Sequence, residues 1–211
     1  MDRLVNSITG SNAELRPLGA VATVRAGYGF RSAIQASPQG TVIAAQLRDV
    51  HRGKLNWKDA IRTSLPRDPK KEELLRSGDI LFSFRGTRYL AVAIEAVPGS
   101  AVASTQFMLV RVSDPGALLP DFLAWQLNQP PAQRYFKSKA TGTAQLSLRR
   151  GDIESVLVAI PSMDLQKKVV ELVELVRLER QHLERLLHNR EQQLNEIAAS
   201  LFDNSERDAE A

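Results

Sequence analysis

The stretch DLQKKVVELVELVRLERQHLERLLHNREQQLNEIAASLF, residues 164–202, decides the fold of this chain. It contains neither proline nor glycine, and its apolar residues recur in steps of three, four and seven, which is typical of one amphipathic helix. A helix of this length would run about 58 Å, too long for the rest of the chain to cover its apolar face. We therefore predict that part of it pairs with another helix. The predicted pairing residues are Val169, Leu172, Val176, Leu183, Leu186, Leu187, Leu194, Ile197 and Leu201.

The heptad phase favours self-pairing but is irregular. With Val169 at position a, later a and d positions are mostly apolar, and the stripe then drifts as it does on a straight helix. Glu179 and Arg190 interrupt the seam. These two side chains either pair across an antiparallel dimer and fix its register, or extend into water.

The composition is that of an intracellular globular protein. The chain has 211 residues, of which 43% are hydrophobic, so it can form one sizeable domain with an appendage. It has no cysteine, which excludes disulfides and thiolate metal sites. We see no signal peptide near the N-terminus and no apolar run of membrane-spanning length, and we predict a cytoplasmic protein.

Charge is distributed unevenly. Residues 1–161 hold 21 Lys and Arg against 13 Asp and Glu, a net +8, whereas residues 162–211 hold 7 against 11, a net −4. These values add to the +4 of the whole chain. A basic domain joined to an acidic helix favours a polyanion partner for the domain and a protein partner for the helix, although a solvated surface has a similar composition.

The pattern before the long helix predicts a mixed, mainly β domain, which makes the fold class α+β. We expect strands at 41–47, 80–84, 89–96, 107–112 and 156–160, with Pro98-Gly99 turning a hairpin between the third and fourth. Helices are expected at 118–129 and 132–139. The predicted boundaries are a flexible lead-in over 1–14, a domain over 15–161, the long helix over 162–203 and a disordered acidic tail over 204–211.

Catalytic and metal chemistry find little support. The three histidines, His51, His182 and His188, lack the spacing of a metal site, so we expect neither metal nor cofactor. Ser83 and Ser104 lack a Gly-x-Ser-x-Gly elbow. We predict that the chain is not an enzyme.

Four turns combine cations with glycine, aromatic or amide residues, and these favour DNA binding. They cover 28–31, 51–54, 84–89 and 137–145. Arginine and glutamine read base edges, lysine and threonine hold phosphates, and glycine lets the backbone approach the duplex. The residues predicted to lie near DNA are Tyr28, Arg31, Arg85, Thr87, Arg88, Lys137, Lys139, Thr143 and Gln145.

Three segments and one junction resemble the DNA specificity subunit of type I restriction-modification systems. The segments are PLG at 17–19 leading to GYGFRS at 27–32, LLRSGDILFS at 74–83, and GTAQLS at 142–147. The junction is Ile160-Pro161-Ser162 with Gln166, followed by the long helix. The resemblance covers residues 15–203. The family often has Glu where this chain has Leu165.

The resemblance implies a target recognition domain joined to a spacer helix, with no catalysis of its own. In that family two recognition domains read a bipartite DNA sequence, and two antiparallel helices set their separation. Adenine methyltransferase subunits and restriction subunits assemble on this scaffold.

This chain departs from the family because it has one domain and one helix where the family has two of each. We expect a homodimer that reads an interrupted palindrome whose half-sites are at most about 17 base pairs apart. Two alternatives remain open: a half-subunit that pairs with a different half on an asymmetric target, and a coiled-coil adaptor that does not bind DNA.

Overall fold

A computed structural model describes residues 13–142 and 146–209, with the backbone alone for 201–209. The chain divides into two compact units, with the boundary between Val169 and Val170. The elements are β1 (Glu14–Pro17), α2 (Leu18–Val21), β2 (Ala22–Ala26), β3 (Val42–Ala45), the 3-10 helix η1 (Leu47–Asp49), β4 (Val50–His51), β5 (Lys54–Leu55), β6 (Ile61–Thr63), β7 (Asp79–Ser83), β8 (Ala91–Ala93), β9 (Ala101–Ala103), β10 (Phe107–Val112), α3 (Pro120–Asn128), α4 (Pro130–Lys139), α5 (Arg150–Glu154), β11 (Leu157–Ile160) and α6 (Met163–Ala209).

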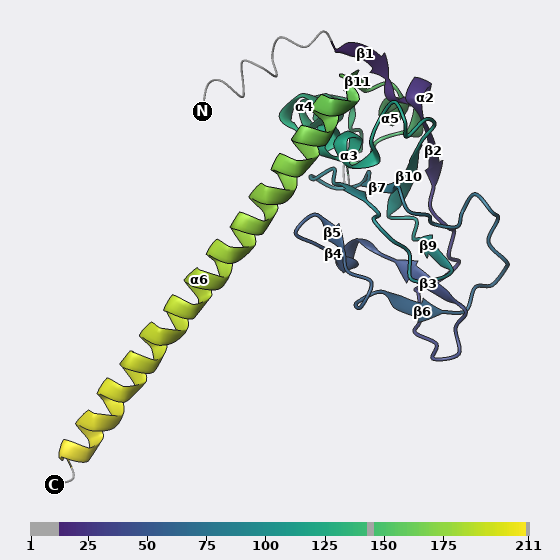
Figure 1. The fold of residues 1–211 in the computed structure, drawn as a ribbon. Helices are drawn as coiled ribbons and strands as arrows, with labels where there is room; N and C mark the ends of the chain where they lie inside the picture. The colour runs from purple at the N-terminus through teal and green to yellow at the C-terminus, as the bar shows by residue number, and fades with distance from the viewer. Residues whose placement is uncertain (1–12, 143–145, 210–211) are drawn as a thin grey trace. The chain divides into compact units, whose positions relative to one another are not determined.

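The first unit is built around an antiparallel sheet of four strands in the order β2-β10-β7-β8 (Figure 1). Strand β7 lies inside this sheet, and all five of its residues are buried. Its side chains alternate between the two faces. Phe82 packs on Phe136 of α4, with ring centroids 4.9 Å apart, while Leu81 joins a core cluster with Ile43 and Ala101 of a second sheet.

That second sheet has three strands in the order β6-β3-β9, in which β3 and β9 are parallel. Two short antiparallel ribbons complete the unit, β1 with β11 and β4 with β5. The sheet of four strands therefore has the second sheet on one face and helices on the other. This is the mixed α+β fold that the sequence predicts.

The Gly78-Asp79 turn opens β7 as expected. Gly78 has a φ of +83°, which favours glycine. The buried Asp79 carboxylate accepts from Arg111 Nε at 2.6 Å and from the backbone N–H of Arg76 at 2.8 Å. Because Arg111 faces Asp79 across the β7–β10 pair, the ion pair locks the register of the two central strands, and its hydrogen bond raises the pKa of Arg111.

The predicted hairpin between 89–96 and 107–112 is wrong. Strands β8 and β10 do not pair with each other but lie on opposite sides of β7. The chain after Pro98-Gly99 enters β9, which crosses to the second sheet and pairs with β3. The three residues Ala-Val-Ala of β9 are too few for an alternating pattern to reveal a strand.

The long helix is confirmed, with different ends. α6 runs from Met163 to Ala209, past the predicted end of the helix at 203 and into the predicted tail. Residues 203–209 contain neither proline nor glycine to stop it. At the other end of the chain, Glu14 belongs to β1 and not to the predicted lead-in, whose residues 1–12 lie outside the described part.

Candidate nucleic-acid interface

Two of the predicted DNA-binding loops leave the same edge of the central sheet. Strands β2 and β7 are both antiparallel to β10, so they run in the same direction on either side of it. Ala26 at the end of β2 pairs with Met108, and Ser83 at the end of β7 pairs with Phe107. The loop that begins at Gly27 and the turn that begins at Phe84 therefore start about 10 Å apart, which is two strand spacings.

The turn from Phe84 to Tyr89 presents three exposed polar side chains, Arg85, Thr87 and Arg88. Ser83 fixes its base, because Ser83 Oγ accepts from the N–H of Leu90 at 2.8 Å and donates to the carbonyl of Arg88 at 3.2 Å. The guanidinium of Arg85 lies 5.0 Å from the centre of the Phe84 ring. A rigid base with cations at its tip suits phosphate or base contacts.

The segment after α4 is hydrogen-bonded to this turn. The N–H of Gly86 donates to the carbonyl of Leu146 at 2.8 Å, and the N–H of Leu148 donates to the carbonyl of Phe84 at 3.0 Å. Thr141 and Ser147 exchange two further backbone hydrogen bonds. The segment 146–148 thus lies beside 84–86, which is distant in sequence, and also pairs with the nearby Thr141.

Helix α4 brings its lysines to the same region. Phe136 is fully buried, and its ring packs on Tyr89 with centroids 5.9 Å apart. Gln133 Nε2 donates to the carbonyl of Tyr89 at 2.7 Å. These contacts anchor α4 beneath the turn, and its last residues include the exposed Lys137 and Lys139. The predicted residues Thr143 and Gln145 lie outside the described part of the chain.

Tyr28 is a correction to the predicted set. Its ring has 0% exposure and packs with Val42 and Val102, so it cannot contact DNA. Its hydroxyl donates to the carbonyl of Arg67 at 2.9 Å, and the Arg67 guanidinium lies 4.6 Å from the ring centre. Tyr28 thus anchors the loop that carries the exposed Arg31.

The turn at 51–54 lies elsewhere. Lys54 Nζ is 2.7 Å from Glu95 Oε1, just after β8, and Ala93 pairs with Ile80 at the beginning of β7. The turn is therefore near the opposite edge of the central sheet from Phe84. His51 Nε2 is also 3.1 Å from Asp59 Oδ2, so two carboxylates lie beside this turn.

The cations of this edge differ from other surface cations in their ion pairing. Among the described residues, no carboxylate forms an ion pair with Arg31, Arg85, Arg88, Lys137 or Lys139. Other surface cations do form such pairs, as Arg67 does with Glu73. A polyanion can bind the edge without first breaking salt bridges.

Arg149 is a candidate that the sequence analysis missed. It is exposed and follows Leu148, whose N–H is bonded to Phe84. In the sequence, Arg149 stands out only as a residue beside a short helical turn. In the structure, its N–H donates to Asp152 Oδ2 at 3.1 Å. No sequence signal could have revealed that residue 149 lies beside residue 84, because strand pairing creates that proximity.

The second unit consists of the rest of α6. Leu172, Val176, Leu183, Leu186, Leu187, Leu194 and Ile197 of the predicted face are all exposed, Leu183 to 55%. Val169 is a partial correction, since at 8% exposure it is buried within the first unit, so the exposed stripe begins at Leu172. The side chain of Leu201 lies outside the described part.

Among residues 13–142 and 146–209, no three His, Asp or Glu side chains cluster so that they could hold a metal ion. None of the helices in the described part combines the length and hydropathy that crossing a membrane requires.

The first unit is thus an α+β domain, and the chain continues as one long helix. The end of the central sheet that carries Arg31, Arg85, Arg88, Lys137, Lys139 and Arg149 is called the basic edge. No protein-family model matches the sequence, and no curated protein matches it. Solved structures do match. The type I restriction-modification S subunit from M. genitalium is 11% identical with a TM-score of 0.55, over 79% of this chain and 39% of that one. The HsdS subunit from Thermoanaerobacter tengcongensis is 16% identical with a TM-score of 0.54, over 87% and 45%.

A chain from a structure concerned with complex assembly and conformational transition of the type I R-M system is 17% identical, with a TM-score of 0.65. It is matched over 88% of this chain and 43% of its own length. This chain therefore has the fold of a type I S subunit and spans less than half the length of the S subunits it matches. The resemblance found in the sequence is confirmed at the level of the fold.

Proposed function

We propose that this chain is the non-catalytic DNA-recognition component of a type I restriction-modification system, in the form of half a specificity subunit. The observation that carries the proposal is the basic edge, where two loops, the end of α4 and the segment after it bring together cations that form no ion pair within the described part of the chain. The fold shared with S subunits supports the same function.

The residues proposed to contact DNA are those of the predicted set without Tyr28, together with Arg149. Arg85, Thr87 and Arg88 lie on a turn with a fixed base, which suits them to base edges. Lys137, Lys139 and Arg149 flank that turn and suit phosphates. Arg31 contributes from the neighbouring loop, and Thr143 and Gln145 remain proposed readers.

The long helix is proposed to form a homodimer. In an antiparallel pair about a two-fold axis, the residue numbers of facing positions have a constant sum. If Glu179 faces Arg190, then Leu172 faces Ile197 and Leu183 faces Leu186. One register thus satisfies the charged pair and these two apolar contacts, although it also places Val176 opposite Gln193. The shared register supports a pair of identical copies of this chain.

Two copies would present two identical readers in opposite orientation, and the target would be an interrupted palindrome. Adenine methyltransferase and restriction subunits are the proposed partners of this dimer. The chain itself would supply recognition and spacing, and the chemistry would belong to those partners.

The test of DNA binding is the substitution Arg88→Ala. Titration against a mixed-sequence duplex of about 40 base pairs should show weaker binding and a salt slope lowered by about one per copy of the chain, because one phosphate or base contact is lost. Lys58→Ala is the matched control, since Lys58 is exposed beside the 51–54 turn. Equal affinities for the two variants would remove the Phe84–Tyr89 turn from the interface.

A further inference from the structure

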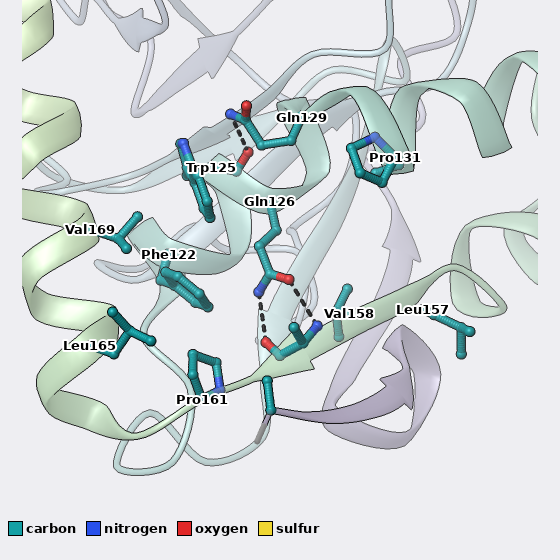
Figure 2. A pocket seen from close by; sticks show the side chains of 13 residues that line it. Phe122, Trp125, Gln126, Gln129, Pro131, Leu157, Val158, Pro161, Leu165 and Val169 are labelled. Carbon is teal, nitrogen blue, oxygen red and sulfur yellow. Dashed lines mark hydrogen bonds between the residues drawn. The ribbon is translucent and has the colours of Figure 1, made fainter. Parts of the chain in front are cut away.

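An apolar groove in the first unit is unused by DNA binding. It has a volume of about 280 Å³ and lies between α3, the beginning of α4, β11 and the first two turns of α6. Figure 2 shows Phe122 and Trp125 on α3 directed toward Leu165 and Val169 of α6. Leu157 and Pro131 lie at its other end.

Hydrogen bonds and ring contacts join the two walls of the groove that α3 and β11 form. Gln126 holds α3 to β11, because its Nε2 donates to the carbonyl of Ala159 at 2.8 Å and its Oε1 accepts from the same residue's N–H at 2.8 Å. Phe122 and Trp125 stack with centroids 5.4 Å apart. Leu157 is 58% exposed at the rim, so apolar surface is open to a partner.

The groove continues the apolar stripe of α6. Leu165 and Val169 line it, and Leu172 and Val176 follow at steps of three and four on the same helix. A helix that pairs with this sequence pattern contacts Leu165 and Val169, which line the groove. A helix is therefore the shape of partner that the continuity indicates.

We infer that the groove receives the C-terminal turns of α6 from a second copy of this chain. This inference rests on the antiparallel homodimer proposed above. In the register in which Glu179 faces Arg190, Val169 faces Ser200, and Leu172 faces Ile197. The partner's turns from Leu194 onward thus run past the groove, and the domain of each copy holds the end of the other's helix.

Such a contact gives the dimer a second site of association. The α6 seam contains Glu179, Arg190 and Gln193, which weaken a coiled coil. Aromatic side chains of the groove add apolar contact at both ends of the helix pair. The domain of one copy and the α6 helix of the other copy then form one interface.

The direct experiment is photo-cross-linking from inside the groove. Trp125 is replaced by p-benzoylphenylalanine, an aromatic of similar bulk, in the full chain. Irradiation should give a covalent dimer, and its cross-linked partner should be the tryptic peptide 191–207. The same probe at Leu15, exposed to 62% on the β1–β11 ribbon but outside the groove, is the control and should not label that peptide.

The competing occupants give different products. A cross-link within one chain to residues 4–12 of the tryptic peptide 4–25 would show that the chain's own N-terminal segment fills the groove, and would overturn the inference. A dimer in solution without any cross-link from Trp125 would overturn it and leave the proposed homodimer intact. A monomer in solution would overturn both.

A variant pair supplies a second measurement. Leu157→Ser and Leu15→Ser both remove one exposed leucine from the same ribbon, so their effects on folding should match. Leu157→Ser should raise the dimer dissociation constant about a hundredfold, because it removes a half-exposed aliphatic side chain, worth about 1.4 kcal/mol, from each of two contacts. Equal constants for the two variants by analytical ultracentrifugation would contradict the groove contact.

Discussion

At the scale of single residues, Gln166 shows how one side chain ties the junction together. It is fully buried, with 0% exposure. Its Oε1 accepts from the N–H of Leu119 at 2.8 Å, and its Nε2 donates to the carbonyls of Ala117 at 2.8 Å and Pro161 at 2.9 Å. One amide therefore connects the start of α6, the segment before it and the entry to α3.

Gln166→Ala should destabilise the first unit by about 3 kcal/mol. The substitution leaves three buried backbone groups without partners, at a cost of about 1–3 kcal/mol each, partly recovered by entering water. Urea denaturation measures the change. Gln192→Ala, at an exposed position of α6, should change stability by less than about 0.5 kcal/mol. A loss below 1 kcal/mol for Gln166→Ala would show that the junction does not depend on this amide.

Residue identity alone could not separate the two roles in the 28–31 loop. Tyr28 and Arg31 both fit a DNA-reading loop by type, yet the first is a core residue and the second is exposed. The difference arises because Tyr28 forms a bridge with Ser104 of the following β9 segment, which places its ring between strands. Such a long-range pairing leaves no local signal, whereas the turn that carries Arg85 and Arg88 between two strands was predictable from sequence.

At the scale of elements, strong periodicity was predictable and strand partners were not. The helix over 164–202 and the strand 107–112 both lie where their patterns predict them. The partner of β8 was predicted wrongly because a short crossing strand, β9, separates it from β10 along the chain. The basic edge depends on that order, since β10 between β2 and β7 makes their loops neighbours.

The apolar stripe of α6 carries the element-scale prediction. Leu183→Glu should convert the dimer to a monomer, because in the proposed register each copy would bury a carboxylate against Leu186. Light scattering after size exclusion measures the mass. Gln192→Glu adds the same charge away from the stripe and should leave the dimer intact. A Leu183→Glu variant that remains dimeric would refute the assigned seam.

At the scale of the whole molecule, the separation of the two readers should depend on helix length. The 47 residues of α6 correspond to about 70 Å, or about 20 base pairs. Its apolar pairing residues recur over heptads, so a whole heptad can be removed without changing their phase. The number of base pairs between the two half-sites should therefore depend on the length of α6.

Selection of bound duplexes from a random pool should yield two identical half-sites in inverted orientation. Deletion of residues 183–189, one heptad, brings the two domains of an antiparallel dimer closer by about 10 Å. The half-sites should remain the same while the spacer between them shortens by about three base pairs, since one base pair rises 3.4 Å. The undeleted chain selected in parallel provides the reference spacer. An asymmetric consensus would exclude the homodimer in favour of two different halves, and an unchanged spacer after the deletion would show that α6 does not set the distance between the readers.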